Sequence, residues 1–100
     1  MEFDLNDEKD RRIAESSPRA LDYPKDAGQA PDREGVYLLI NSDNEVICVG
    51  MASGSSLKDE IKAQGDTGDE KGAKTCRWFV TRSSKAAEEL GADLIRKYCL

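Results

Sequence analysis

Gly35-Val36-Tyr37-Leu38-Leu39-Ile40 and Val46-Ile47-Cys48-Val49-Gly50 are the two stretches that decide the fold of this 100-residue chain. Each is a short apolar run, and the residues between them, Asn41-Ser42-Asp43-Asn44-Glu45, are polar and of turn-forming types. Two such runs on either side of a polar turn are typical of a β-hairpin. We therefore predict two short, largely buried antiparallel strands in this region.

A helix and a loop follow the hairpin. The pair Ser55-Ser56 can cap a helix that runs to about Gln64, and Leu57 and Ile61 then lie four residues apart on one face. Residues 65–72 contain three glycines and several other residues that tolerate a left-handed backbone. We predict a flexible loop there.

A strand and a second helix complete the chain. Residues 75–81 are rich in β-branched and aromatic types and give the strongest strand pattern. Because side chains alternate along a strand, Cys76, Trp78 and Val80 share one face and Arg77, Phe79 and Thr81 the other. The pair Ser83-Ser84 can cap the final helix, whose apolar residues recur at helical spacing and predict a buried stripe: Ala87, Leu90, Leu94 and Tyr98.

These elements predict an α+β fold in the order β-β-α-β-α. The expected architecture is a small three-stranded antiparallel sheet flanked by helices, formed by residues 35–100. A chain of 100 residues is long enough for one modest core and too short for two.

Residues 1–34 differ from the rest of the chain because they are polar and contain all three prolines. Residues 7–15 predict one or two helical turns with Asn6 as the N-cap, and residues 16–33 predict an extended lead-in. We expect a partly flexible arm, or an arm that wraps the domain through Leu21 and Tyr23.

Composition excludes several classes of protein. No apolar run approaches the roughly 20 residues needed to cross a bilayer, and the N-terminus has no signal-peptide pattern. We therefore expect a soluble, cytoplasmic protein without a membrane partner. The three cysteines, Cys48, Cys76 and Cys99, are widely spaced, and the chain has no histidine, so we expect neither a zinc site nor a disulfide framework.

The charge balance does not favour tight binding of nucleic acid. The net charge is −5; residues 1–34 carry ten acidic and six basic side chains, and residues 35–100 carry ten acidic and nine basic ones. Proteins that hold phosphates usually show a positive excess on the binding face. Tight binding of nucleic acid would therefore need a local basic patch.

The triplets Gly35-Val36-Tyr37 and Cys48-Val49-Gly50, together with the element order over residues 31–98, resemble the GIY-YIG nuclease domain. The resemblance implies a site in which a glutamate on a later helix binds a divalent metal ion. An arginine on the first helix steadies the phosphate, and a tyrosine orients the attacking water. These groups provide what phosphodiester hydrolysis needs, namely charge neutralisation and a positioned nucleophile.

Most positions that the resemblance assigns carry other residue types in this chain. Tyr37 matches the first tyrosine, although a buried strand tyrosine explains it equally well. The second tyrosine is replaced by Cys48, the lysine that often follows by Met51, the arginine by Glu60 and the metal-binding glutamate by Gly91. The resemblance thus predicts a GIY-YIG-like domain with a degenerate site, no nuclease activity and no bound cofactor.

Three functions remain open. The first is a non-catalytic module that binds DNA, RNA or another anionic ligand in the former active-site cleft. The loops Ser53–Ser56 and Gly65–Gly68 can present backbone N–H groups to an anion. The candidate cations for this function are Lys58, Lys62, Lys74, Arg77 and Arg82.

The second function is a divergent endonuclease that uses Tyr37, Glu88 and a magnesium ion, although a solvent-exposed Glu88-Glu89 pair is the simpler interpretation of those carboxylates. The third is a protein-interaction or small-molecule-binding domain. The net negative charge of the chain supports this interpretation, and residues 1–34 would then be the segment that contacts the partner.

Overall fold

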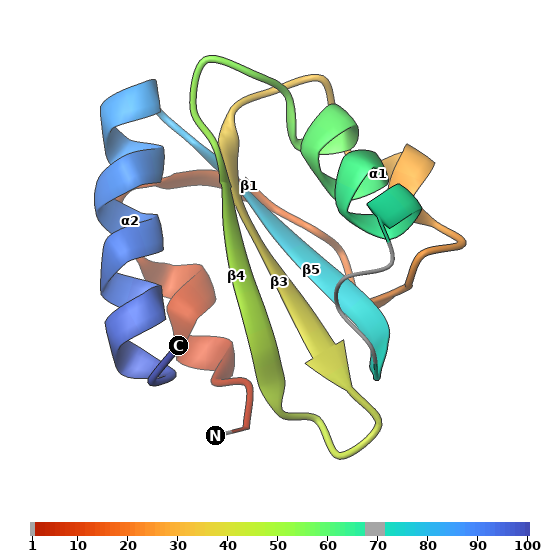
Figure 1. Ribbon diagram of the computed structural model, residues 1–100. Helices are drawn as coiled ribbons and strands as arrows, with labels where there is room; N and C mark the ends of the chain where they lie inside the picture. Colours follow the sequence, from red (N-terminus) through yellow and green to blue (C-terminus); the bar gives the residue numbers. More distant parts are fainter. Residues whose placement is uncertain (1, 68–71) are drawn as a thin grey trace.

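The computed structural model describes residues 2–67 and 72–100, which form an antiparallel sheet with one α-helix on each face (Figure 1). The predicted α+β class and the order of the last five elements are confirmed. The elements are η1 (Leu5–Lys9), β1 (Ile13–Ser16), β2 (Leu21–Asp22), η2 (Ala27–Gln29), β3 (Gly35–Asn41), β4 (Val46–Ala52), α1 (Leu57–Thr67), β5 (Ala73–Thr81) and α2 (Ser84–Lys97).

The sheet has five strands, so the prediction of three was wrong. Its order is β1-β5-β3-β4, and β2 also pairs with β5. β1 and β2 lie one after the other along the outer edge of β5, with Ile13 opposite Thr81 and Leu21 opposite Cys76. Two short segments of the N-terminal region therefore pair with the backbone of β5 on the side away from β3.

The predicted hairpin is formed by β3 and β4. Its turn is held by Asn41, whose side-chain oxygen accepts hydrogen bonds from the N–H groups of Asp43 and Glu45, both at 2.9 Å. Asn44 has a φ of 63°, a left-handed conformation that asparagine tolerates well. The register places Tyr37 opposite Gly50.

Each face of the sheet has its own core. On one face, Trp78 and Val80 of β5 pack with Leu57 and Ile61 of α1. On the other face, Phe79 packs with the predicted stripe of α2, which is buried throughout. The alternation predicted for Cys76, Trp78, Val80 and Phe79 is therefore correct.

Both helices begin after a serine, as predicted. The Ser56 hydroxyl accepts a hydrogen bond from the N–H of Asp59 at 3.1 Å, and the Ser83 hydroxyl accepts one from Ala86 at 3.1 Å. α1 continues to Thr67, so residues 65–67 are helical and not part of the predicted loop. Of that loop, residues 68–71 lie outside the described part of the chain.

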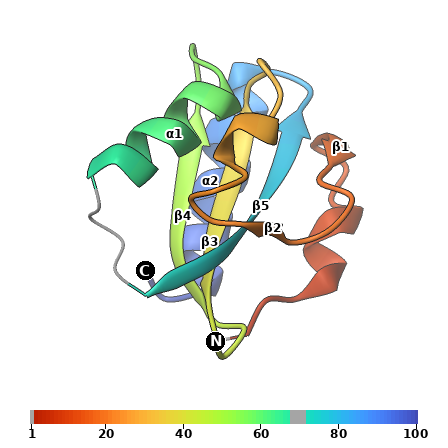
Figure 2. The ribbon, with the colours of Figure 1, turned by 90° about the vertical axis from the view of Figure 1, so that its right-hand side faces the viewer.

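The N-terminal region wraps the domain, and its strands β1 and β2 run antiparallel along β5 (Figure 2). The short helix predicted at residues 7–15 is correct only in part: η1 is a 3-10 helix over Leu5–Lys9 capped by Asp4 and not Asn6, whereas Ile13–Ser16 is a strand. Ile13 is buried in the core, and pairing with β5 stabilises this segment as a strand, whereas a short isolated helix is marginal because its first turn is costly to form. Within the described residues, no helix has the length and apolar character that crossing a bilayer requires.

Candidate functional site

Tyr37 lies in the core between the sheet and α1, with 4% of its surface exposed. Its ring covers the backbone of Gly50: a Cβ atom at Gly50 would lie 2.0 Å from the Tyr37 Cζ atom and 2.3 Å from the hydroxyl oxygen. Gly35 is crowded in the same way, because a Cβ there would lie 2.0 Å from the carbonyl oxygen of Phe79. Both triplet glycines are therefore required by close packing.

Cys48 is half-buried and packs against the same core as Tyr37. The other two cysteines differ in exposure, since Cys76 is buried and Cys99 exposed. Burial, helped by the negative charge of Asp26, raises the pKa of the Cys76 thiol to about 11. This thiol is consequently protonated at neutral pH and behaves as an apolar core group.

Met51 and Gly91 are in direct contact on the opposite face of the sheet. A Cβ atom at Gly91 would lie 2.4 Å from the Met51 Cγ atom and 2.6 Å from its sulfur. Gly91 is buried in α2, and Met51 packs against the core beneath that helix. The methionine side chain thus occupies the space that a side chain at residue 91 would need.

The two carboxylates singled out from the sequence lie on different helices. Glu60 is half-buried on α1, whereas Glu88 is exposed on α2. In the described residues, no group of three or more His, Cys, Asp or Glu side chains could together hold a metal ion.

A hollow of about 600 Å³ lies at the end of the sheet where both α-helices begin. Arg33 and Arg82 line it, and Lys58 and Lys85 follow the first residues of α1 and α2. The lining residues are Asp32, Arg33, Glu34, Gly54, Ser55, Ser56, Thr81, Arg82 and Ser83.

The Glu34 carboxylate is itself an anion bound in this hollow. Its carboxylate accepts hydrogen bonds from the Ser84 hydroxyl and the Gly54 N–H, and these bonds lower the pKa of Glu34. The N–H groups of Leu57 and Lys58 donate to the carbonyl oxygens of Arg33 and Pro31, at 2.8 and 3.2 Å. The Gly54 N–H and the first two N–H groups of α1 are therefore used internally, and the Arg82 side chain also donates to the carbonyl oxygen of Arg11 at 3.0 Å.

The structure brings together two of the five predicted cations. Lys58 and Arg82 lie at the helix-start end of the sheet, and Lys62 lies farther along α1. Lys74 is exposed near the beginning of β5, at the opposite end of that strand. Arg77 lies elsewhere: it pairs with Glu8 at 3.1 Å and stacks 4.6 Å from the ring centre of Phe3.

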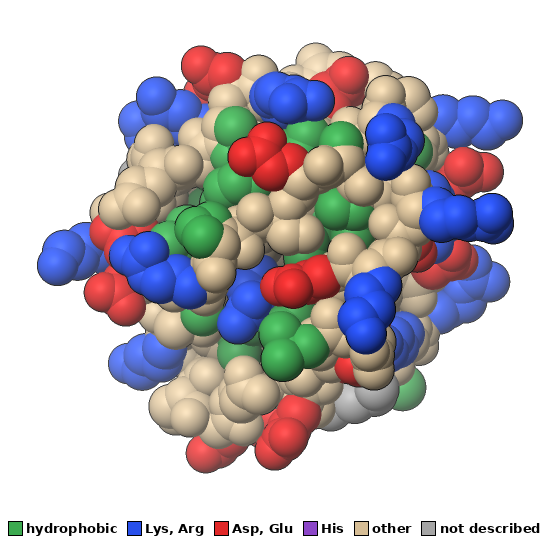
Figure 3. Space-filling model, turned by 180° about the vertical axis from the view of Figure 1, so that it is seen from behind, with side chains coloured by type: hydrophobic (Ala, Val, Ile, Leu, Met, Phe, Trp, Pro, Cys, Tyr) green, Lys and Arg blue, Asp and Glu red, His purple; other side chains and the backbone are tan. Residues whose placement is uncertain are grey.

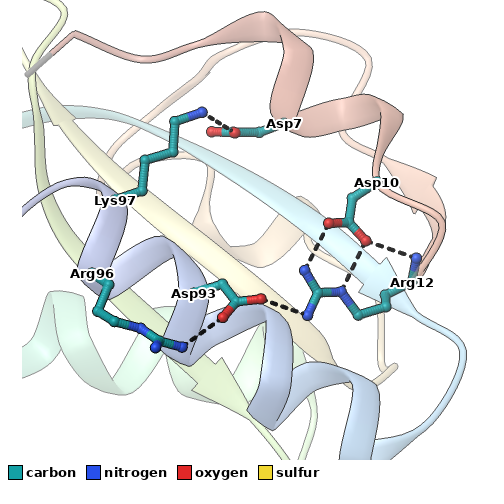
Figure 4. A network of polar contacts seen from close by, with 6 residues as sticks. All are labelled: Asp7, Asp10, Arg12, Asp93, Arg96 and Lys97. Carbon is teal, nitrogen blue, oxygen red and sulfur yellow. Dashed lines mark hydrogen bonds and ion pairs between the residues drawn. The ribbon is translucent and has the colours of Figure 1, made fainter.

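A second hollow, of about 310 Å³, lies between η1 and α2 and contains a polar network that the sequence analysis missed (Figure 4). At one end, the Tyr98 hydroxyl donates to Asp7 and accepts from the N–H of Asp4 at 3.0 Å. Lys97 pairs with Asp7 and, at 3.0 Å, with Asp4. Burial lowers the pKa of Lys97, but its bonds to Asp7 and Asp4 outweigh this and raise the pKa overall.

At the other end of the network, Arg12 joins the N-terminal region to α2. Its guanidinium pairs with Asp10 and with Asp93, each at 2.8 Å, and Asp93 also pairs with Arg96 at 2.7 Å (Figure 4). The hydrogen bonds from Arg12 lower the pKa of both Asp10 and Asp93. Because these partners are up to 81 residues apart, no local sequence pattern could have revealed them.

The arrangement of strands and helices is that of a GIY-YIG domain, as comparison with solved structures shows. The magnesium-bound GIY-YIG N-terminal endonuclease domain of UvrC from Thermotoga maritima is 24% identical, with a TM-score of 0.65, over 75% of this chain and 88% of that chain. A point mutant of that domain bound to its catalytic divalent cation gives 24% identity and a TM-score of 0.64, over 75% and 87%.

At this level of identity the likeness shows the fold alone. No curated protein sequence matches the chain. Residues 20–97 match the family described as Domain of unknown function (DUF7508), and the chain belongs to this family.

Proposed function

We propose that this protein is a GIY-YIG-fold domain that binds nucleic acid and does not cleave it. The observation that carries the absence of cleavage is the contact between Met51 and Gly91. The position that the family resemblance assigns to the metal-binding glutamate has no side chain. The space around it is filled by an apolar one, so a carboxylate could enter only if Met51 moved.

The basic residues around the first hollow support the binding function. Arg33, Lys58, Arg82 and Lys85 lie where α1 and α2 both begin, so the positive ends of two helix dipoles add to their charge. Asp32 and Glu34 also line the hollow, so binding there depends on these four basic side chains outnumbering the two carboxylates. Phosphate oxygens are the natural partners of such a cluster.

The face of the molecule seen from behind carries both signs of charge (Figure 3). On the face seen from behind, Lys and Arg side chains alternate with Asp and Glu and form no broad single-sign patch (Figure 3). A ligand held by phosphate contacts would therefore be expected at the helix-start end, and binding should be moderate and sensitive to salt.

Binding can be tested with a short fluorescent DNA and RNA, titrated at several salt concentrations. We expect Arg82→Glu to weaken binding about 3- to 10-fold and to reduce the salt slope by about one. Lys74→Glu is the matched control, because Lys74 is also exposed but lies at the other end of β5, and it should change binding little. Equal effects of the two substitutions, or no binding at low salt, would overturn the proposal.

Cleavage is tested separately with supercoiled plasmid in magnesium or manganese. We expect no nicking. Metal-dependent nicking that disappears in Glu88→Gln would instead establish a divergent endonuclease that uses Glu88, although Tyr37 lies on the opposite face of the sheet from α2. Absence of both nicking and nucleic-acid binding would favour the third function, a protein or small-molecule partner.

A further inference from the structure

The Glu34 carboxylate uses one of its two oxygens inside the protein. Oε2 accepts hydrogen bonds from the N–H of Gly54, in the loop before α1, and from the hydroxyl of Ser84, the first residue of α2. In the described part of the chain, Oε1 accepts no hydrogen bond and pairs with neither Arg33 nor Arg82, although both arginines line the same hollow. The carboxylate is therefore held in place by Oε2, and Oε1 is left as an acceptor for a ligand.

The charges around this acceptor determine which kind of donor it can take. Arg33 and Arg82 line the hollow, and Lys58 and Lys85 lie at the helix starts beside it, so a cationic donor would be repelled. A neutral N–H group is not repelled, and negative groups on the same ligand would be attracted to these cations. The hollow therefore fits a molecule that carries neutral N–H donors and negative charges close together.

Nucleotides with an exocyclic amino group meet both conditions. Adenine, cytosine and guanine each carry an NH2 group on a neutral ring, and the phosphates of the strand lie a few bonds away. Uracil and thymine instead have a single edge N–H between two carbonyl oxygens, which would face the carboxylate and repel it. Acceptance of an amino hydrogen by glutamate is an established way of recognising cytosine.

We propose that Oε1 of Glu34 accepts a hydrogen bond from the amino group of an unpaired base, while the surrounding cations hold the neighbouring phosphates. This inference rests on the proposed function and makes single-stranded nucleic acid its ligand. An unpaired base can enter a hollow, and its edge is not occupied by a partner base. The volume of about 600 Å³ is in the range of small-molecule sites, roughly 300–1,000 Å³.

Oligocytidylate and oligouridylate of equal length are matched probes, because cytosine has an amino group where uracil has a carbonyl oxygen. We expect the full chain to bind the cytidine strand about 3- to 10-fold more tightly, as for one additional hydrogen bond. Fluorescence titration at low salt measures both dissociation constants. Equal affinity for two strands that both bind would overturn the proposal.

Glu34→Gln should reverse this preference. The amide oxygen can keep the bonds to Gly54 and Ser84, so the NH2 group replaces Oε1 and donates to the carbonyl oxygen of uracil. Asp32→Asn is the matched control, because it removes one negative charge from the same hollow and should strengthen binding of both strands alike. If Glu34→Gln also strengthens both strands alike, Glu34 acts through its charge alone and the proposal fails.

Free nucleosides separate this proposal from the proposed function. Cytidine and uridine carry no phosphate, so their effect on the NMR signal of the Gly54 amide reports contact with the Glu34 carboxylate alone. Cytidine should shift this signal saturably, and uridine should not. If neither strand binds at low salt, the nucleic-acid function fails, whereas a cytidine-specific shift would still support the base contact. Strands that bind without any cytidine-specific shift would overturn the base contact and leave the proposed function intact.

Discussion

Gly91 illustrates how a residue that looks unsuitable locally is explained by a neighbour distant in sequence. Glycine inside a helix costs about 1 kcal/mol relative to alanine. Here a Cβ atom would lie 2.4 Å from the Met51 Cγ atom, so glycine allows α2 to approach β4. The two residues act as a pair, and each determines which side chain the other position accepts.

We predict that the sign of the effect of Gly91→Ala depends on residue 51. In the natural chain Gly91→Ala should destabilise the fold by about 1 kcal/mol or more, because Met51 must move. After Met51→Ala has removed the obstacle, the same change should stabilise the fold by about 1 kcal/mol through helix propensity. Denaturant unfolding of the four proteins measures the coupling. Additive effects would show that the contact carries no energy.

At this scale, the sequence predicts what depends on near neighbours. Leu38 and Leu39 beside Tyr37 are compatible with a buried tyrosine, and a glycine in a helix is compatible with close packing at Gly91 as well as with loss of a site. The environment of Arg77 could not be predicted, because its partners Glu8 and Phe3 are about 70 residues away and come together only in the fold.

Among the elements, α2 is fixed at both of its flanks. One flank lies against β4 through Gly91, and the other is joined to the N-terminal region through Asp93, Lys97 and Tyr98. The contacts with the N-terminal region include the hydrogen bond between the Tyr98 hydroxyl and Asp7 of η1, so ionisation of Tyr98 is linked to the attachment of η1.

Tyr98 should ionise only in strongly alkaline solution. Burial and the hydrogen bond to Asp7 raise its pKa from 10.0 to about 12. Because the folded-state pKa is raised, the stabilising contribution is complete below pH 10 and is lost as the pH rises through about 12. Phenolate absorbance during an alkaline titration should show this late step, and Tyr98→Phe should remove it. A step for Tyr98 near pH 10 would contradict the expectation.

The elements that the sequence predicts well are those with long, local patterns. β5 and α2 have runs of nine and 14 residues, long enough for their periods to be clear. β1 has four residues, of which only Ile13 is fully buried, so its sequence has no strand alternation to detect. It is a strand because it pairs with β5, and a pattern within four residues cannot reveal a partner so far along the chain.

For the molecule as a whole, the N-terminal region contributes to the main core. Leu21, Ala27 and Ala30 are each 5% exposed or less and pack with Trp78 in the core under α1. The division expected at residue 34 predicts that residues 35–100 fold alone. The strand pairing leads us to expect that this fragment would be only marginally stable.

We therefore predict that residues 35–100 alone will show poorly dispersed amide signals and no cooperative unfolding transition. The point substitution Leu21→Ala, in the full chain, should keep the fold and cost about 2–4 kcal/mol in denaturant unfolding. Arg19→Ala, at an exposed neighbouring position, serves as its control and should cost little. A fragment with the dispersion and midpoint of the full chain would show that the N-terminal region is an accessory.

The pairing of β1 and β2 with β5 also has a consequence for biosynthesis. Ile13 pairs with Thr81 and Leu21 with Cys76, so β1 and β2 are synthesised before β3 and β4 but have their partner in β5, which is synthesised after both. At a synthesis rate of roughly 5–20 residues per second, β5 follows β1 and β2 only after several seconds. During that interval the nascent chain contains a hairpin and a helix but an incomplete sheet. Its apolar side chains are then most exposed to binding by chaperones.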